Sequence, residues 1–332
     1  LDLLYTDGTS DVVPADQADP AILAELPVAK QDAEGRILYR DALRDALADE
    51  MRRDKRVIFY GEDVADYGGA FKMTKGLIET FGRDRVFNTP ISEAAICGTA
   101  VGAGIVGLRP VVELMYMDFA LMASDQIANQ AGKWHYMSGA QTTVPLVIRA
   151  SVGAGKGYGG QHSQSLESVF THLPGLVIVY PATAADAKGL LKSAIRSDDP
   201  VLFVESQGLY ATRGHVPEDP DLLVPLGVAR VAREGKDATI VAWGPAVPDA
   251  IAAAATLAAD GIECDVIDLR TLVPLDMDTV LASVRKTGRC VVIHEATKTS
   301  GFGAELCAAV QESCFYHLEA PIVRVTGWDT PY

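Results

Sequence analysis

The sequence predicts an α/β fold in which doubly wound parallel sheets form two successive domains. Short, solidly apolar segments recur along the chain, segments with one helical apolar face lie between them, and most apolar segments end in polar or glycine-containing turns. Parallel strands that are covered by helices on both faces have this solidly apolar character. A length of 332 residues also suffices for about two domains.

The composition excludes several classes of protein. A net charge of −15 argues against a nucleic-acid partner, because phosphate binding needs a basic face. No apolar run approaches the roughly 18 residues that span a membrane. The five cysteines form no CxxC pair, so we expect buried free thiols in a reducing compartment rather than disulfides or zinc. These features are typical of a cytoplasmic enzyme.

Residues 1–36 differ from the rest of the chain. They contain eight acidic residues against Lys30 and Arg36, with prolines at positions 14, 20 and 27. This composition predicts an acidic N-terminal arm or linker that runs over the surface. The segment has no apolar core, so it does not resemble a signal peptide.

Residues 37–210 predict the first domain. Leu43, Leu47 and Met51 form the apolar face of its opening helix. Its expected strands are 57–60, 109–115, 145–150, 176–180 and 201–204. Ligands of such sheets bind beyond the carboxyl ends of the strands. We therefore expect function in the turns at 61–63, 116–119 and 151–165.

Residues 211–225 are rich in proline, aspartate and glycine and predict a linker. A second alternating unit occupies residues 226–332 and predicts the second domain. Its expected strands are 238–242, 264–269, 289–294 and 322–325, and the alanine-rich segment 248–259 is its clearest helix.

Glu93 stands in front of an unusual helical segment. The next fifteen residues, AAICGTAVGAGIVGL, are almost wholly apolar or small, which indicates a buried helix packed closely through Gly98, Gly102, Gly104 and Gly107. A carboxylate at the mouth of such a helix is desolvated, as functional carboxylates often are. The structural alternative is a carboxylate that complements the helix dipole.

The other turns contain three further candidates. Residues 151–165, SVGAGKGYGGQHSQS, have five glycines in the ten residues before His162 and match neither a P-loop nor a GxGxxG motif. A mobile loop that delivers His162 fits better, although a structural histidine is the alternative. Phe119 follows a strand and could stack on a flat ring, whereas most of 115–137 is expected core. Glu62 could hold a ligand or cap a turn, and the cap is favoured.

Seven motifs resemble, as a set, the β chain of thiamine-diphosphate-dependent 2-oxo acid dehydrogenases. They are GEDV (61–64), NTPISE (88–93), GLRPVVELMYMDFA (107–120), GGQHSQS (159–165), PGL (174–176), DAKGLL (186–191) and DLRTLVPLD (268–276). The likeness extends in order from about residue 36 to the end of the chain. The family includes pyruvate, branched-chain and acetoin enzymes. It implies a thiamine-pyrimidine-binding domain followed by a transketolase C-terminal-type domain.

The resemblance implies roles for single residues. Glu93 matches the glutamate that hydrogen-bonds the aminopyrimidine of thiamine diphosphate and favours its imino tautomer. Phe119 matches the aromatic residue that stacks on this ring, and Glu62 is taken as a further cofactor-binding residue. His162 matches the histidine that assists substrate handling and acyl transfer to a lipoyl-lysine.

Several members of the family also bind a structural potassium ion, largely through backbone carbonyls. The matching positions are Leu146, Ala194, Ile195, Ser197 and Asp199. The family often has an acidic residue at position 197 and asparagine at position 199, so this chain departs from the pattern at both.

The diphosphate-binding motif of the family is absent. In the family, a GDG motif on the α chain holds the diphosphate and Mg²⁺, and this sequence contains no GDG. The resemblance therefore implies a shared cofactor and an α partner, in an α2β2 assembly or a dimer of a fused α–β chain. A lipoyl-bearing acyltransferase is the second implied partner. Residues 1–36 favour the fused arrangement, and the family continues past Tyr332 with a short tail.

Two other functions remain open. A transketolase-like or deoxyxylulose-phosphate-synthase-like enzyme shares the fold and the glutamate but has its diphosphate domain in the same chain. A non-catalytic regulatory subunit is the other alternative, although Glu93, Phe119 and His162 are retained. The sequence does not distinguish pyruvate from a branched-chain 2-oxo acid or acetoin, and VGAG at 152–155 leans toward the acetoin enzymes.

Overall fold

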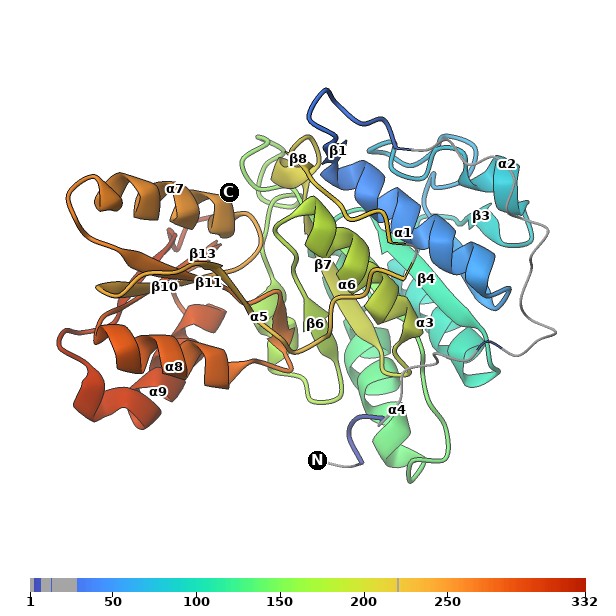
Figure 1. Cartoon of the computed structure of the whole chain (residues 1–332). Helices are drawn as coiled ribbons and strands as arrows, with labels where there is room; N and C mark the ends of the chain where they lie inside the picture. Colours follow the sequence, from blue (N-terminus) through green and yellow to red (C-terminus); the bar gives the residue numbers. More distant parts are fainter. Residues whose placement is uncertain (1–2, 7–12, 14–28, 220) are drawn as a thin grey trace.

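The computed structural model describes residues 3–6, 13, 29–219 and 221–332. Within them, the chain folds into two sheets that are each covered by helices, and the smaller sheet lies beside the larger one (Figure 1). Among these residues, no helix is long and apolar enough to cross a membrane. All five cysteines are free, and all but the half-buried Cys307 are buried. The predicted α/β fold class is confirmed.

The larger sheet has seven strands in the order β12-β6-β7-β5-β4-β2-β3. Six strands are mutually parallel, and β12 runs antiparallel to β6 at one edge. Their bounds are β2 (Val57–Gly61), β3 (Val86–Asn88), β4 (Arg109–Leu114), β5 (Val147–Val152), β6 (Val177–Val179), β7 (Val201–Ser206) and β12 (Thr271–Val273). Because β12 comes from the second half of the chain, the edge strand joins the two halves.

Helices cover both faces of this sheet. The long helices α1 (Tyr39–Arg53) and α6 (Ala184–Arg196) pack on one face, and α3 (Glu93–Ile105) and α4 (Gly132–Met137) on the other (Figure 1). Successive strand residues point to opposite faces, so Phe59 packs with α1 while Tyr60 packs with α3. The strands are solidly apolar for this reason.

The short elements of this domain are β1 (Ile37–Leu38), α2 (Leu77–Phe81), η2 (Met117–Leu121), η3 (Gln126–Ala131), α5 (Glu167–Thr171), η4 (Gln207–Leu209) and β8 (Arg213–Gly214).

The smaller sheet has five strands in the order β14-β13-β10-β11-β9, and only β9 is antiparallel to its neighbour. The helix α7 packs on one face, and α8 and α9 pack on the other. The bounds are β9 (Arg230–Arg233), β10 (Ala238–Ala242), α7 (Ala246–Ala258), β11 (Cys264–Asp268), α8 (Met277–Thr287), β13 (Cys290–Thr297), α9 (Phe302–Cys314), η5 (Phe315–His317) and β14 (Val323–Gly327).

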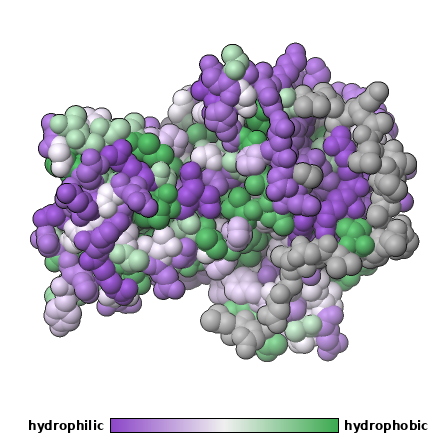
Figure 2. Space-filling view, in the orientation of Figure 1, coloured by the Kyte–Doolittle hydropathy of each residue, from purple (hydrophilic) through white to green (hydrophobic). Residues whose placement is uncertain are grey.

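One hydrophobic core continues from the larger sheet into the smaller one. A single cluster of buried side chains contains Val112 and Leu114 of β4 together with Val292 of β13 and Leu306 of α9. On the face shown in Figure 2, hydrophilic residues predominate on the second domain, and apolar residues gather where the two domains meet. The second domain is therefore packed against the first.

Most of the predicted acidic arm lies outside the described residues. Its described part contacts the first domain: the Tyr5 hydroxyl donates to the Leu176 carbonyl at 3.4 Å, and the Thr6 N–H donates to Asp199 Oδ1 at 2.8 Å.

Three charged side chains lie buried in the centre of the larger sheet. Arg149 of β5 lies between Glu113 of β4 and Glu205 of β7, and the three are 2%, 6% and 1% exposed. The guanidinium donates to both Glu205 oxygens at 2.7 and 2.9 Å and to Glu113 Oε2 at 2.8 Å. Although burial alone lowers the pKa of Arg149, the charges of Glu205 and Glu113 raise it above its usual value. These bonds connect three neighbouring strands close to their carboxyl ends.

We expect Arg149→Met to destabilise the fold strongly. The substitution leaves two buried carboxylates without their cation, and breaking a buried pair in this way costs about 3–5 kcal/mol of unfolding free energy. Urea unfolding of the purified chain measures the loss. Arg83→Met is the control, because Arg83 pairs with Asp66 at the surface, where both side chains are more than half exposed. Equal unfolding midpoints for the two variants would contradict the prediction.

Candidate active site

The topology brings four predicted site residues to one edge of the larger sheet. The strands β3, β2, β4 and β5 are consecutive parallel neighbours, so their carboxyl ends lie at the same edge. Glu62 follows β2, Phe119 lies in η2 after β4, and His162 lies in the loop after β5. Glu93 begins α3, the helix that follows β3.

Glu93 is the first residue of α3 and is only 8% exposed. Ser92 precedes it and makes no side-chain cap bond. The Glu93 carboxylate accepts no hydrogen bond from the residues that the structure describes. Because no described side chain or backbone group occupies this carboxylate, it is available for a ligand.

The packing of α3 agrees only partly with the expectation. A Cβ at Gly98 would lie 3.0 Å from Gln126 Oε1, and one at Gly104 would lie 3.4 Å from Pro145, so these two glycines permit close packing. The expectation is wrong for Gly102, which faces open space, and for Gly107, which lies past the end of the helix. One side of α3 therefore remains uncovered.

Glu62 lies in the electrostatic field of Glu93. It is half-buried, and burial first, followed by the negative charges of Glu93, Asp63 and Glu113, raises its pKa above the usual value. Several carboxylates therefore gather where β2 ends and α3 begins. Such a group favours ligands that donate hydrogen bonds.

His162 lies between two aromatic rings. Its ring centroid is 4.8 Å from that of Tyr116 and 5.3 Å from that of Phe119, with interplanar angles of 79° and 80°. Edge-to-face contacts of this kind are favourable. The structure thus brings Phe119 and His162 into contact, and both are half-buried, so each keeps accessible surface.

The loop that carries His162 packs tightly at this residue and is anchored just after it. A Cβ at Gly153 would lie 2.2 Å from the His162 carbonyl oxygen, so only glycine fits there. After His162, Gln164 Nε2 donates to Oδ1 of the buried Asp118 at 2.7 Å. Because Asp118 precedes Phe119, this bond ties the loop to the segment that carries the aromatic ring.

Several residues of this edge were missed by the sequence reasoning. Tyr116 was not singled out, nor were the buried charges Glu113, Arg149 and Glu205. A signal for the charges existed: each stands near the end of a solidly apolar strand, where a charge requires a buried partner. No sequence signal placed Tyr116 against His162, because the contact joins two separate loops.

The expected potassium positions lie at the opposite edge of the sheet, where β5 and β7 begin. The carbonyl oxygens of Leu146 and Ala194 each accept a backbone N–H, at 2.8 and 3.2 Å. The guanidinium of Arg109 donates to the carbonyl oxygens of Ile195 and Ser197. Each of these oxygens keeps a second lone pair that could bind a cation.

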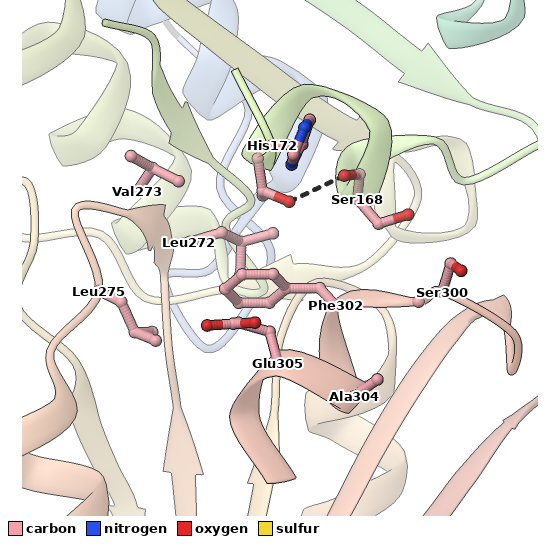
Figure 3. A pocket seen from close by; sticks show the side chains of 11 residues that line it. Ser168, His172, Leu272, Val273, Leu275, Ser300, Phe302, Ala304 and Glu305 are labelled. Atoms are coloured by element: carbon pink, nitrogen blue, oxygen red, sulfur yellow. Dashed lines mark hydrogen bonds between the residues drawn. The ribbon is translucent and has the colours of Figure 1, made fainter. Parts of the chain in front are cut away.

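Two hollows border the segments that carry site residues, and a third lies between α5 and the second domain. One of 640 Å³ separates the His162 loop, at Gly160 and Gln164, from the C-terminal residues 329–332. Another of 690 Å³ lies where α5 faces β12 and α9, with Phe302 and Glu305 on its α9 side (Figure 3). An apolar groove of 740 Å³ runs between β2 and α3. None of these three hollows is lined by both Glu93 and His162.

Two family models match the chain almost end to end. Residues 36–213 match the transketolase pyrimidine-binding domain, and residues 227–332 match the transketolase C-terminal domain. Among solved structures, a split-gene transketolase described as an inactive β4 tetramer aligns with a TM-score of 0.72 and 26% identity, covering 88% of this chain and 89% of that one.

Relatives of known name are considerably more similar in sequence. The chain is 47% identical over 314 residues to a pyruvate dehydrogenase E1 component subunit beta of Rhizobium meliloti, covering 95% of this chain and 67% of the relative. It is 48% identical over 308 residues to a 2-oxoisovalerate dehydrogenase subunit beta of Pseudomonas aeruginosa, covering 88% of this chain and 87% of the relative. With its two transketolase-type domains, the chain belongs to the family of β subunits of 2-oxo acid dehydrogenases.

Proposed function

We propose that this chain is the β half of a thiamine-diphosphate-dependent dehydrogenase that decarboxylates a 2-oxo acid oxidatively and passes the acyl group to a lipoyl-lysine. The observation that carries the proposal is the unpartnered, buried carboxylate of Glu93 at the edge where Phe119 and His162 meet. The relatives are named for pyruvate and 2-oxoisovalerate dehydrogenases, so the proposed substrate is a 2-oxo acid.

Glu93 is the residue that activates the cofactor in this proposal. Its carboxylate is buried at the start of α3 and lacks a partner among the described residues, which suits a hydrogen bond to an aminopyrimidine. When bound, thiamine diphosphate supplies the electron sink into which carbon dioxide is lost. Glu93 would hold the proton that the pyrimidine nitrogen exchanges, and Phe119 would stack on the ring. Glu62 would add a second carboxyl group beside Glu93.

His162 would act on the substrate side of the same site. Its imidazole is held edge-on by Tyr116 and Phe119, and a half-buried imidazole in this position can donate or accept a proton as the acyl group leaves. The hollow of 640 Å³ beside its loop offers one approach for a long lipoyl arm.

The diphosphate and its Mg²⁺ would be held by an α partner. The chain lacks a GDG motif, and Glu93 begins α3, the helix whose Gly102 faces open space. A partner chain that carries the motif would close the edge and complete the cofactor site. An α2β2 assembly, working with a lipoyl-bearing acyltransferase, is the arrangement that we propose.

A structural potassium ion belongs to the same proposal. Carbonyl oxygens are the hard ligands that such a cation prefers. Leu146, Ala194, Ile195, Ser197 and Asp199 lie where β5 and β7 begin, and the carbonyl oxygens of Ile195 and Ser197 already face one cationic group, the guanidinium of Arg109. We expect a higher thermal midpoint of the purified chain in KCl than in NaCl at equal ionic strength, because an ion that binds only the folded state stabilises it. Equal thermal midpoints in the two salts would contradict the proposed potassium site.

Glu93→Gln tests the central role. With the α partner present, we expect thiamine-dependent decarboxylation to fall by at least about a hundredfold, because the amide cannot take over the proton exchange. The thermal midpoint should stay close to that of the parent. Glu312→Gln, at an exposed position of α9, is the matched control and should keep full activity. Undiminished turnover of the Glu93 variant would refute the assignment.

A further inference from the structure

The loop that carries His162 has a second anchor, Glu167, which begins α5. This side chain is fully buried, and both of its carboxylate oxygens are used. Ser165 Oγ donates to Oε2 at 2.7 Å, and the indole Nε1 of Trp243 donates to Oε1 at 3.2 Å. Burial raises the pKa of Glu167, and the hydrogen bonds that it accepts act in the opposite direction. One carboxylate therefore bridges the end of the loop and a residue of the second domain.

The second domain holds its side of this bridge rigidly. Trp243 directly follows β10 and is 1% exposed. Its ring stacks on His294 at 5.1 Å and meets Phe302 of α9 edge-on at 5.8 Å. With both neighbours in place, the indole N–H has little freedom to turn away from Glu167.

The opposite side of α5 also faces the second domain. Ser168 and His172 of this segment line one side of the hollow of 690 Å³, and Phe302 and Glu305 of α9 line the other (Figure 3). Beside this hollow, the bond from Trp243 to Glu167 is a polar link between the start of α5 and the second domain. A displacement of Glu167 would be passed to Ser165 and to the loop before it.

We infer that Glu167 is a positioning residue that couples the second domain to His162. The inference rests on the proposed function of His162. Asp118 fixes the loop to the first domain through Gln164, and Glu167 fixes it to the second through Trp243. The two anchors lie on the same side of His162, within five residues of it, and together they set where its ring stands against Tyr116 and Phe119.

Glu167→Gln and Trp243→Phe test the inference in the complete complex with its α partner and acyltransferase. Glu167→Gln keeps the size of the side chain but replaces one carboxylate oxygen by an amide nitrogen, which cannot accept a hydrogen bond. Trp243→Phe removes the indole N–H and leaves a smaller ring. We expect transfer to lipoamide to slow by about tenfold, the rate equivalent of one such bond, while decarboxylation with an artificial electron acceptor changes by less than about twofold. His162→Ala should show the same selectivity with a larger loss. Glu167→Gln added to His162→Ala should cause no further loss, because Glu167 acts through His162.

Two exposed positions provide matched controls. Glu305→Gln faces the hollow beyond α5, and Trp328→Phe lies on the surface, so both should leave the two activities unchanged. The inference is overturned if Glu167→Gln and His162→Ala multiply their losses, or if Glu167→Gln slows both activities equally. If His162→Ala leaves transfer to lipoamide unchanged, the proposed role of His162 is wrong. The inference about Glu167, which rests on that role, is then wrong as well. If the Glu167 variant does not fold, Trp243→Phe tests the same bond from the side of the second domain.

Discussion

The bonds of Arg149 to Glu113 and Glu205 are the constraint on which the rest of the site depends. They join β4, β5 and β7 within two or three residues of the points where these strands end. The segments with Phe119 and His162 leave from β4 and β5, so the bonded strands fix where these two segments begin. Buried ion pairs add little net stability, but their loss is costly, and so they specify one arrangement of the strands.

Around these three strands, side-chain hydrogen bonds hold the loops in place. Asp118 holds the histidine loop through Gln164, and Glu167 extends the same loop to Trp243. The second domain shares its hydrophobic core with the first and contributes the edge strand β12. The second domain therefore packs against the domain that carries Glu93, Phe119 and His162, and it contributes none of these three residues. What the chain presents is one side of a site, and the uncovered side of α3 lies next to it.

The sequence predicted the fold well because its strands are covered on both faces. Segments such as 57–60 and 201–204 are solidly apolar, and each forms a strand of the larger sheet. By contrast, β3 and β12 have three residues each, and β12 becomes a strand only by pairing with a distant partner. Phe119 and His162 could be placed on turns from the strand pattern. Glu93 could be placed at the start of a helix from the apolar and small residues that follow it, and the roles of all three came from motifs. The contact of Tyr116 with His162 and the bridge through Glu167 could not be predicted, since both join segments whose approach is set by tertiary packing.

The central claim is that this chain holds the pyrimidine side of a cofactor whose diphosphate side belongs to another chain. Calorimetric titration of thiamine diphosphate with Mg²⁺, into the chain alone and into an equimolar mixture with its α partner, tests this most directly. We expect no saturable binding to the chain alone and one cofactor per αβ pair in the mixture. Equally tight, stoichiometric binding to the chain alone would contradict it.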